Sequence, residues 1–224
     1  LVTSGTASVG LLIARWLANT TATKVLLLSD GASVSAKVAA EMEAVYKGST
    51  GDLTNAKSII TSLPVGEFAL TGVWHAAGAQ MPRSDAGDTS TVLREAFFSK
   101  ALAAHALHRT TLANPLDVFM LSSSMATLLG AAGQLGYCAA ANGIDVLSGY
   151  RAFVGRSTLS IQWGAWSECD ALPSSMHLTS ESTADRSAMV LREAFGSCMT
   201  STMAMVKFSW ATMAQEGGPV PKLL

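Results

Sequence analysis

The chain has 224 residues, of which 49% are hydrophobic and 14% are charged, and its formal net charge is −1. This length is enough for one sizeable core, and the small charged fraction favours a sheet that is covered on both faces. The balanced charge offers no surface for nucleic acid or an anionic membrane. No apolar run approaches the roughly 20 residues that span a bilayer.

Three cysteines, Cys138, Cys169 and Cys198, show no metal-binding or redox spacing, and their odd number argues against a disulfide framework. We therefore expect a cytoplasmic protein without a metal site. The chain opens with Leu1-Val2-Thr3, which reads as the end of a truncated first strand. We expect residues 1–224 to form one domain, cut from a larger multidomain polypeptide.

Apolar runs alternate with segments of helical period, a pattern typical of βαβ units and a parallel sheet. The polar stretch 167–192 is expected to be irregular, with part of it serving as a lid. These elements predict a single α/β domain with a doubly wound parallel sheet of the Rossmann type. The expected strands are 1–3, 25–29, a short strand near 51–54, 72–75, 118–122, 159–163 and 205–208, and the expected helices are 9–17, 35–46, 56–63, 91–112, 137–153 and 187–197.

The loop after the first expected strand contains small residues in the order Gly5-x-Ala7-x-x-Gly10, preceded by Thr3. In a Rossmann fold the pyrophosphate of a dinucleotide meets a helix N-terminus at this place, and small residues let the backbone approach it. Ala7 replaces one of the three usual glycines. The loop is therefore compatible both with dinucleotide binding and with an ordinary βα turn.

Two aspartates follow expected strands and could face the adenosine half of a dinucleotide. Asp30 comes 20 residues after Gly10, where a carboxylate bonds the ribose 2′-hydroxyl and repels a 2′-phosphate, which favours NAD over NADP. Asp30 could equally open a turn with Gly31. Asp52 ends the short strand near 51–54, where it could meet the adenine or belong to a solvated turn.

Three side chains form a candidate site for carbonyl reduction. Ser124 follows a strand, Tyr137 comes 13 residues later at the start of a helix, and Lys100 lies on the preceding long helix. Reduction of a ketone needs a proton donor and a second hydroxyl at the carbonyl oxygen. A phenol has a pKa of about 10, so a neighbouring ammonium must favour its ionisation near neutral pH. Each residue alone is more often structural.

Motifs along nearly the whole chain carry a family resemblance, in order and with the family's spacing, at residues 1–10, 14–18, 72–78, 133–137, 159–164 and 208–210. They resemble the ketoreductase domains of modular polyketide and fatty acid synthases, which belong to the short-chain dehydrogenase/reductase superfamily. The resemblance implies that Tyr137 is the proton donor, that Ser124 binds the substrate carbonyl and that Lys100 is the catalytic lysine.

The resemblance also implies the cofactor and the partners. The cofactor would be NADPH, with Ala77 and Gly78 beside it, and Asp30 stands where the family usually has the arginine that clamps the 2′-phosphate, so NADH is not excluded. The substrate would be a 3-ketoacyl group tethered to an acyl carrier protein. The other partners would be neighbouring synthase domains.

The sequence departs from the family at the fourth member of the catalytic set. The family places an Asn four residues after the tyrosine, where this chain has Ala141, followed by Asn142. A residue at i+5 points about 100° away from i+4, so Asn142 would not replace it. An active reductase, a catalytically degenerate structural domain of a synthase and a stand-alone short-chain dehydrogenase remain the alternatives. Ala141 disfavours the last, because free-standing members carry a Lys there.

Overall fold

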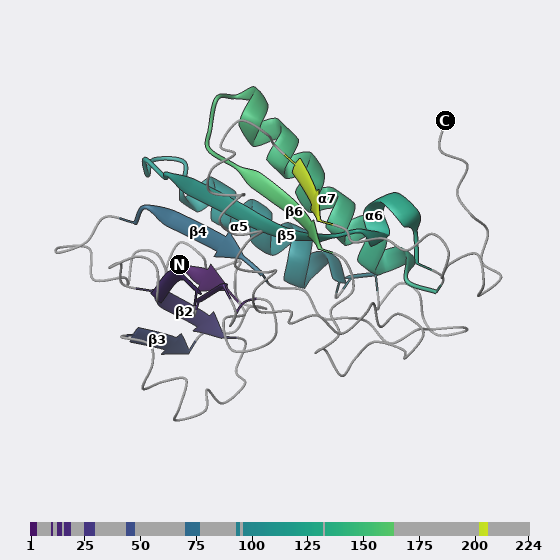
Figure 1. The fold of residues 1–224 in the computed structure, drawn as a ribbon, viewed down its shortest axis with the longest axis horizontal. Coiled ribbons are helices and arrows are strands. Elements are labelled where there is room, and N and C mark those ends of the chain that lie inside the picture. Colours follow the sequence, from purple (N-terminus) through teal and green to yellow (C-terminus); the bar gives the residue numbers. More distant parts are fainter. Residues whose placement is uncertain are drawn as a thin grey trace.

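A seven-stranded, entirely parallel sheet forms the centre of the protein in a computed structural model (Figure 1). The structure describes residues 1–3, 10, 13–14, 16–18, 25–29, 44–47, 70–76, 93–94, 96–131, 133–163 and 202–205. The strands, in chain order, are β1 Val2–Thr3, β2 Leu26–Ser29, β3 Ala44–Lys47, β4 Gly72–His75, β5 Val118–Ser124, β6 Leu159–Trp163 and β7 Thr202–Met205.

The strand order β3-β2-β1-β4-β5-β6-β7 places the first strand beside both the second and the fourth. Such an order reverses direction between β1 and β4, and in open α/β sheets ligands bind beyond the carboxyl ends of the strands at this switch point. The paired residues at this point are Thr3 and His75, each at the end of its strand. The order and the parallel pairing confirm the Rossmann-type α/β fold.

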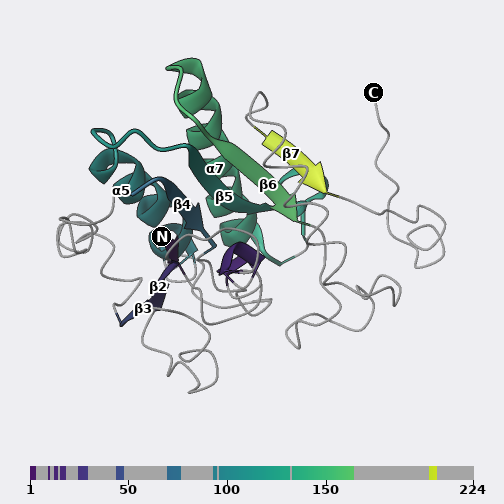
Figure 2. The same ribbon diagram turned by 60° about the vertical axis from the view of Figure 1, so that its left-hand side comes forward.

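Helices pack on the central strands and bury the core. The helices whose bounds lie in the described part of the chain are the π-helical segment η2 Phe97–Leu102, α5 Ala103–Thr110, the one-turn α6 Ala126–Leu129 and α7 Leu135–Phe153. Figure 2 shows α5 and α7 on one side of β5 and β6. The shared core joins strand residues Val73, Phe119 and Leu121 to helix residues, among them Leu107 and Ile144. Among the described residues, no helix is long and apolar enough to cross a membrane.

Three expected elements are corrected by the structure. Residues 35–46 carry a helical apolar pattern, but Ala44–Lys47 is strand β3, so the helix prediction is wrong at its end and the third strand does not lie near 51–54. The reason is tertiary: β3 pairs in parallel with β2 from Leu26 to Ser29, and this ladder overrides the local pattern. Likewise β7 is Thr202–Met205 rather than 205–208. The expected helices 56–63 and 187–197 and the lid region lie outside the described residues.

Candidate active site

The carboxyl ends of β1 and β4 are joined by a buried hydrogen-bond chain. The Thr3 hydroxyl lies 2.9 Å from His75 Nδ1, and His75 Nε2 lies 2.9 Å from the carbonyl oxygen of Lys100. A carbonyl only accepts, so Nε2 carries the proton, Nδ1 accepts from Thr3, and the Thr3 oxygen accepts from the Ala76 N–H at 3.2 Å. Burial lowers the pKa of His75 to about 4, which keeps this tautomer neutral. The chain anchors the backbone of Lys100 to the sheet.

Lys100 belongs to η2, the π-helical interruption of the long helix that the sequence predicts over 91–112. Such interruptions are rare and often occur at functional sites. Helix α7 approaches the helical stretch that contains η2 closely, because two residues of α7 have no side chain. A Cβ on Gly136 would come within 3.1 Å of the Leu93 backbone, and one on Gly143 within 3.3 Å of the Ala101 methyl group.

This close approach brings Lys100 and Tyr137 together. The Lys100 Nζ lies 5.3 Å from the centroid of the Tyr137 ring. Burial lowers the pKa of Lys100 to about 8, against an opposing effect of the Asp145 carboxylate. Burial raises the pKa of Tyr137, while a hydrogen bond with the Ser124 side chain lowers it. The predicted residues Lys100, Ser124 and Tyr137 therefore form one cluster, with a buried ammonium beside a phenol that is protonated at neutral pH.

Ser124 is held at the end of β5 by the turn that follows it. The Ala126 N–H donates to Ser124 Oγ at 3.2 Å, and the Thr127 hydroxyl donates to the Ser124 carbonyl at 2.9 Å. The preceding Ser123 hydroxyl donates to the carbonyl of Ala141 at 3.3 Å, which ties the strand to α7. These bonds fix the position of the Ser124 side chain relative to the helix that carries Tyr137.

The burial of the residues on α7 shows where the side chain of the absent family Asn would lie. Ala141 is completely buried on the face that meets Ser123, whereas Asn142 is exposed to solvent. The prediction that Asn142 does not replace the absent Asn is therefore confirmed. The buried methyl group of Ala141 supplies no polar atom to the cluster.

The predicted cofactor residues divide into two groups. Thr3 lies at the switch point with its hydroxyl engaged by His75 and Ala76, and Gly10 is helical and buried. The remaining predicted residues, Gly5, Asp30, Asp52, Ala77 and Gly78, lie outside the described part of the chain. Strand β3 ends at Lys47, so Asp52 does not end the third strand as predicted. No group of three or more possible metal ligands occurs among the described residues.

Two parts of this site have no clear signal in the sequence. The motif around His75 indicates no particular role for the imidazole, and its bond to the Lys100 carbonyl is not foreseeable from that motif. The sequence motifs also do not mark the Asp145 carboxylate or its partner Gln162. Asp145 lies eight residues after Tyr137, which is about two helical turns, so helical spacing alone could have placed it near the cluster.

The parallel sheet and the Lys–Ser–Tyr cluster define a short-chain reductase, and comparisons with known proteins identify its family. The model of the KR domain matches residues 1–168. Polyketide synthase GfsB of Streptomyces halstedii is 36% identical over 177 residues, and a mycocerosic acid synthase-like polyketide synthase of Mycobacterium tuberculosis is 32% identical over 177 residues. Both alignments cover 75% of this chain, but 3% and 8% of those relatives.

A solved structure described as A-type ketoreductases from a modular polyketide synthase superposes with a TM-score of 0.85 and 28% identity. The superposition covers 96% of this chain and 48% of that one. The chain belongs to the KR domain family, the ketoreductase domains of polyketide synthases. It is thus an oxidoreductase domain of the short-chain reductase type, and it spans a small part of the curated synthases that it matches.

Proposed function

We propose that the protein reduces a 3-ketoacyl group, tethered to an acyl carrier protein, to the 3-hydroxyacyl group within a polyketide synthase. The observation that carries this proposal is the buried Lys100 ammonium, 5.3 Å from the ring of Tyr137, together with the Ser124 side chain, whose interaction with the phenol lowers the pKa of Tyr137. These groups supply a proton donor, a second hydroxyl and a cation at one place. The KR family membership supports the substrate class.

Each of the three residues has a separate role in the reduction of the ketone. Ser124 donates a hydrogen bond to the carbonyl oxygen, and Tyr137 transfers its proton to the same oxygen as negative charge develops there. The proton transfer leaves a phenolate, which is costly in a buried position. The ammonium of Lys100 offsets that cost, because an opposite charge a few ångströms away stabilises the ionised phenol.

The hydrogen-bond donor at the switch point suits a nicotinamide dinucleotide. Lys100 is a buried ammonium, 5% exposed, at the sheet edge where dinucleotides bind, and a cation in such a place is suited to hydroxyl acceptors of a ribose. The bound cofactor supplies the hydride. We propose NADPH, with NADH not excluded because of Asp30. The residues proposed to hold it are Thr3, Gly5, Gly10, Asp30, Asp52, Ala77 and Gly78.

The remaining partners follow from the family. The curated relatives are large polyketide synthases, so we propose that neighbouring synthase domains present the carrier-bound substrate to this one. We place the reaction in the cytoplasm, because the odd number of cysteines shows no disulfide framework.

Cofactor binding and turnover test this proposal together. Titration with NADPH and with NADH, followed by the fluorescence of the reduced nicotinamide, should give a saturable change, and a 3-ketoacyl thioester should then be reduced. If neither cofactor binds, the degenerate structural domain is the correct alternative. If a cofactor binds but the thioester is not reduced, the substrate class is wrong or the site is inactive, and the tethered 3-ketoacyl reduction is rejected.

A further inference from the structure

A hydrogen-bonded carboxylate lies behind the catalytic cluster. Asp145, on α7, accepts at Oδ1 from the Ser160 hydroxyl and at Oδ2 from Gln162 Nε2 at 2.9 Å. Both donors come from the buried strand β6. Each carboxylate oxygen therefore has a fixed partner, and the orientation of the charge relative to the cluster is set by the sheet.

The same amide continues the chain toward the catalytic serine. Gln162 Nε2 also donates to the Thr127 hydroxyl at 2.9 Å, and this hydroxyl donates its single proton to the carbonyl of Ser124 at 2.9 Å. Because Nε2 has an acceptor for each of its two protons, the Gln162 amide has one defined orientation. Asp145 is thus connected through Gln162 and Thr127 to the backbone of Ser124.

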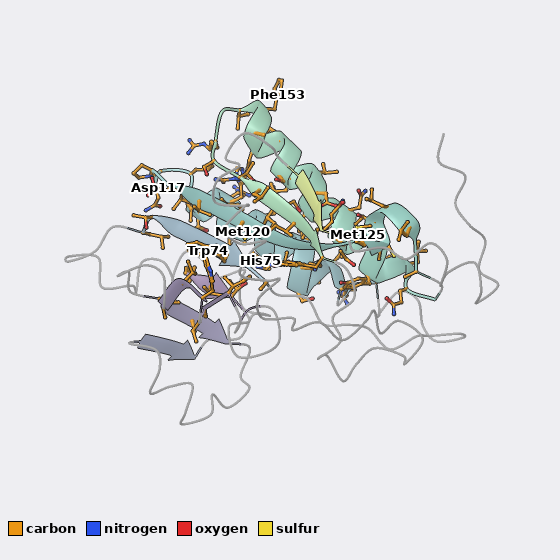
Figure 3. All side chains as sticks on the ribbon, viewed as in Figure 1. Trp74, His75, Asp117, Met120, Met125 and Phe153 are labelled. Carbon is orange, nitrogen blue, oxygen red and sulfur yellow. The ribbon has the colours of Figure 1, made fainter. Side chains whose placement is uncertain are left out.

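Asp145 also lies on the helix that packs on the Lys100 segment, where a Cβ on Gly143 would come within 3.3 Å of the Ala101 methyl group. The ammonium is buried, its pKa is lowered by desolvation, and the Asp145 carboxylate raises that pKa in opposition. Among the described residues, the other titratable groups shown to act on or lie beside Lys100 are His75 on β4, which is neutral, and Tyr137 on α7. Asp117 and Asp145 are the two carboxylates in the described part of the chain. Figure 3 shows Asp117 at the far end of β5 from Met125, the neighbour of Ser124.

We propose that Asp145 is a positioning residue for the reduction, one that keeps Lys100 charged beside Tyr137 and holds Ser124 through Gln162 and Thr127. This inference rests on the proposed function, since it assigns a role in the same reaction. Asp145 acts on Lys100 as a fixed charge and on Ser124 as the first member of the hydrogen-bond chain.

The test compares Asp145→Asn with Asp117→Asn, which also removes one carboxylate but does so at the end of β5 away from Ser124. The wild-type rate of thioester reduction should fall as pH rises through about 8, where Lys100 loses its proton. This fall is the alkaline limb of the pH–rate profile. In Asp145→Asn the alkaline limb should move to lower pH by about one unit, so that at pH 8 the rate is about fivefold lower. Asp117→Asn should keep the wild-type limb. An unmoved limb in Asp145→Asn overturns the inference.

A second variant separates the two roles and serves if Asp145→Asn does not fold. Gln162→Leu keeps the Asp145 charge but breaks the chain to Ser124, so kcat should fall several-fold while the alkaline limb stays in place. An unchanged kcat would overturn the positioning of Ser124. The Lys100 ammonium is also titrated directly by 15N NMR in the wild-type and Asp145→Asn proteins. A lower pKa in the variant, with no turnover in either protein, would support Asp145 while rejecting the proposed function.

Discussion

Helix α7 carries a buried polar cluster near each end, and the two clusters differ in their charge complement. Near its start, the Lys100 ammonium lies beside Tyr137 and under the influence of the Asp145 carboxylate. Near its end, Arg151 is buried to 2% exposure among neutral partners. The first cluster lies at the carboxyl ends of the strands, where the switch point is. The second lies at the opposite, amino ends of the strands.

The neutral partners of Arg151 are well defined. Its Nη1 donates to His108 Nδ1 at 2.9 Å, its Nε and Nη2 donate to the carbonyl of Ser157 at 3.3 and 3.0 Å, and its guanidinium carbon lies 3.8 Å from the centroid of the Phe119 ring. Burial lowers the pKa of Arg151 to about 10, so the group is charged throughout the physiological range. This cluster joins α7 to α5 and β5.

The contrast separates a cation that can change its charge from one that cannot. With a pKa of about 8, Lys100 loses its proton within the range of ordinary assays, and a single nearby carboxylate changes that pH. Arg151 contributes packing and hydrogen bonds without any titration near neutrality. Substitutions near the start of α7 should therefore change reaction rates, and those near its end should change stability.

The largest effect is expected from Tyr137→Phe. This substitution removes the proton donor and keeps the ring beside Lys100, so kcat for thioester reduction should fall by about a thousandfold. The matched control is Tyr150→Phe, on the exposed far part of the same helix, where the ring lies 5.9 Å from that of His108. The measurement is the steady-state rate of thioester reduction in both variants. Retained activity in Tyr137→Phe would remove Tyr137 from the proposed mechanism.

A smaller effect is expected on the free energy of unfolding at acid pH. His75 is neutral in the fold with a pKa of about 4, against 6.5 in an unfolded chain, so the stability it contributes is complete above pH 6.5 and is lost as pH falls toward 4. Between pH 7 and pH 5 the free energy of unfolding should decrease by about 2 kcal/mol through this residue. Urea unfolding at several pH values measures it.

The variants His75→Gln and His108→Gln separate the contributions of the two clusters to the pH dependence of the free energy of unfolding. Burial also lowers the pKa of His108, whose Nδ1 accepts from Arg151. The His75 variant should show the flatter dependence on pH, because the His75 ring is the more deeply buried of the two. Equal slopes in the two variants would contradict the view that the switch-point histidine dominates. If His75→Gln does not fold, NMR titration of the wild-type imidazole should show no protonation of His75 above pH 5.

Sequence patterns predicted the parts of this fold that depend on local periodicity. The buried runs at 72–75, 118–122 and 159–163 are found as strands β4, β5 and β6, and the helix expected over 137–153 is α7. Strand β3 was missed because Ala44–Lys47 continues a helical apolar pattern, and only the ladder with β2 makes it a strand. The π-helical turn at Lys100 has no periodic signal that would distinguish it from ordinary helix.

The site was predictable to the extent that family motifs name its residues. Lys100, Ser124 and Tyr137 were identified in this way, and the structure brings them together. The bond from His75 to the Lys100 carbonyl joins elements that are 25 residues apart, and the bonds from Asp145 to β6 cross from helix to sheet. Such contacts depend on the strand order and on the close approach of α7, neither of which a single sequence encodes locally.

The smallest effect is expected from Ala141→Asn, which restores the residue that the family places there. The side chain enters a buried position beside the Ser123 bond, where an amide can join the polar cluster, so kcat should rise by less than tenfold. The gain is small because Asp145 already holds Lys100 charged. Asn142→Ala, at the exposed neighbouring position, should leave kcat unchanged. A rise in Ala141→Asn that exceeds tenfold would mean that Asp145 does not offset the missing amide, whereas a fall would mean that the buried methyl group is required for packing.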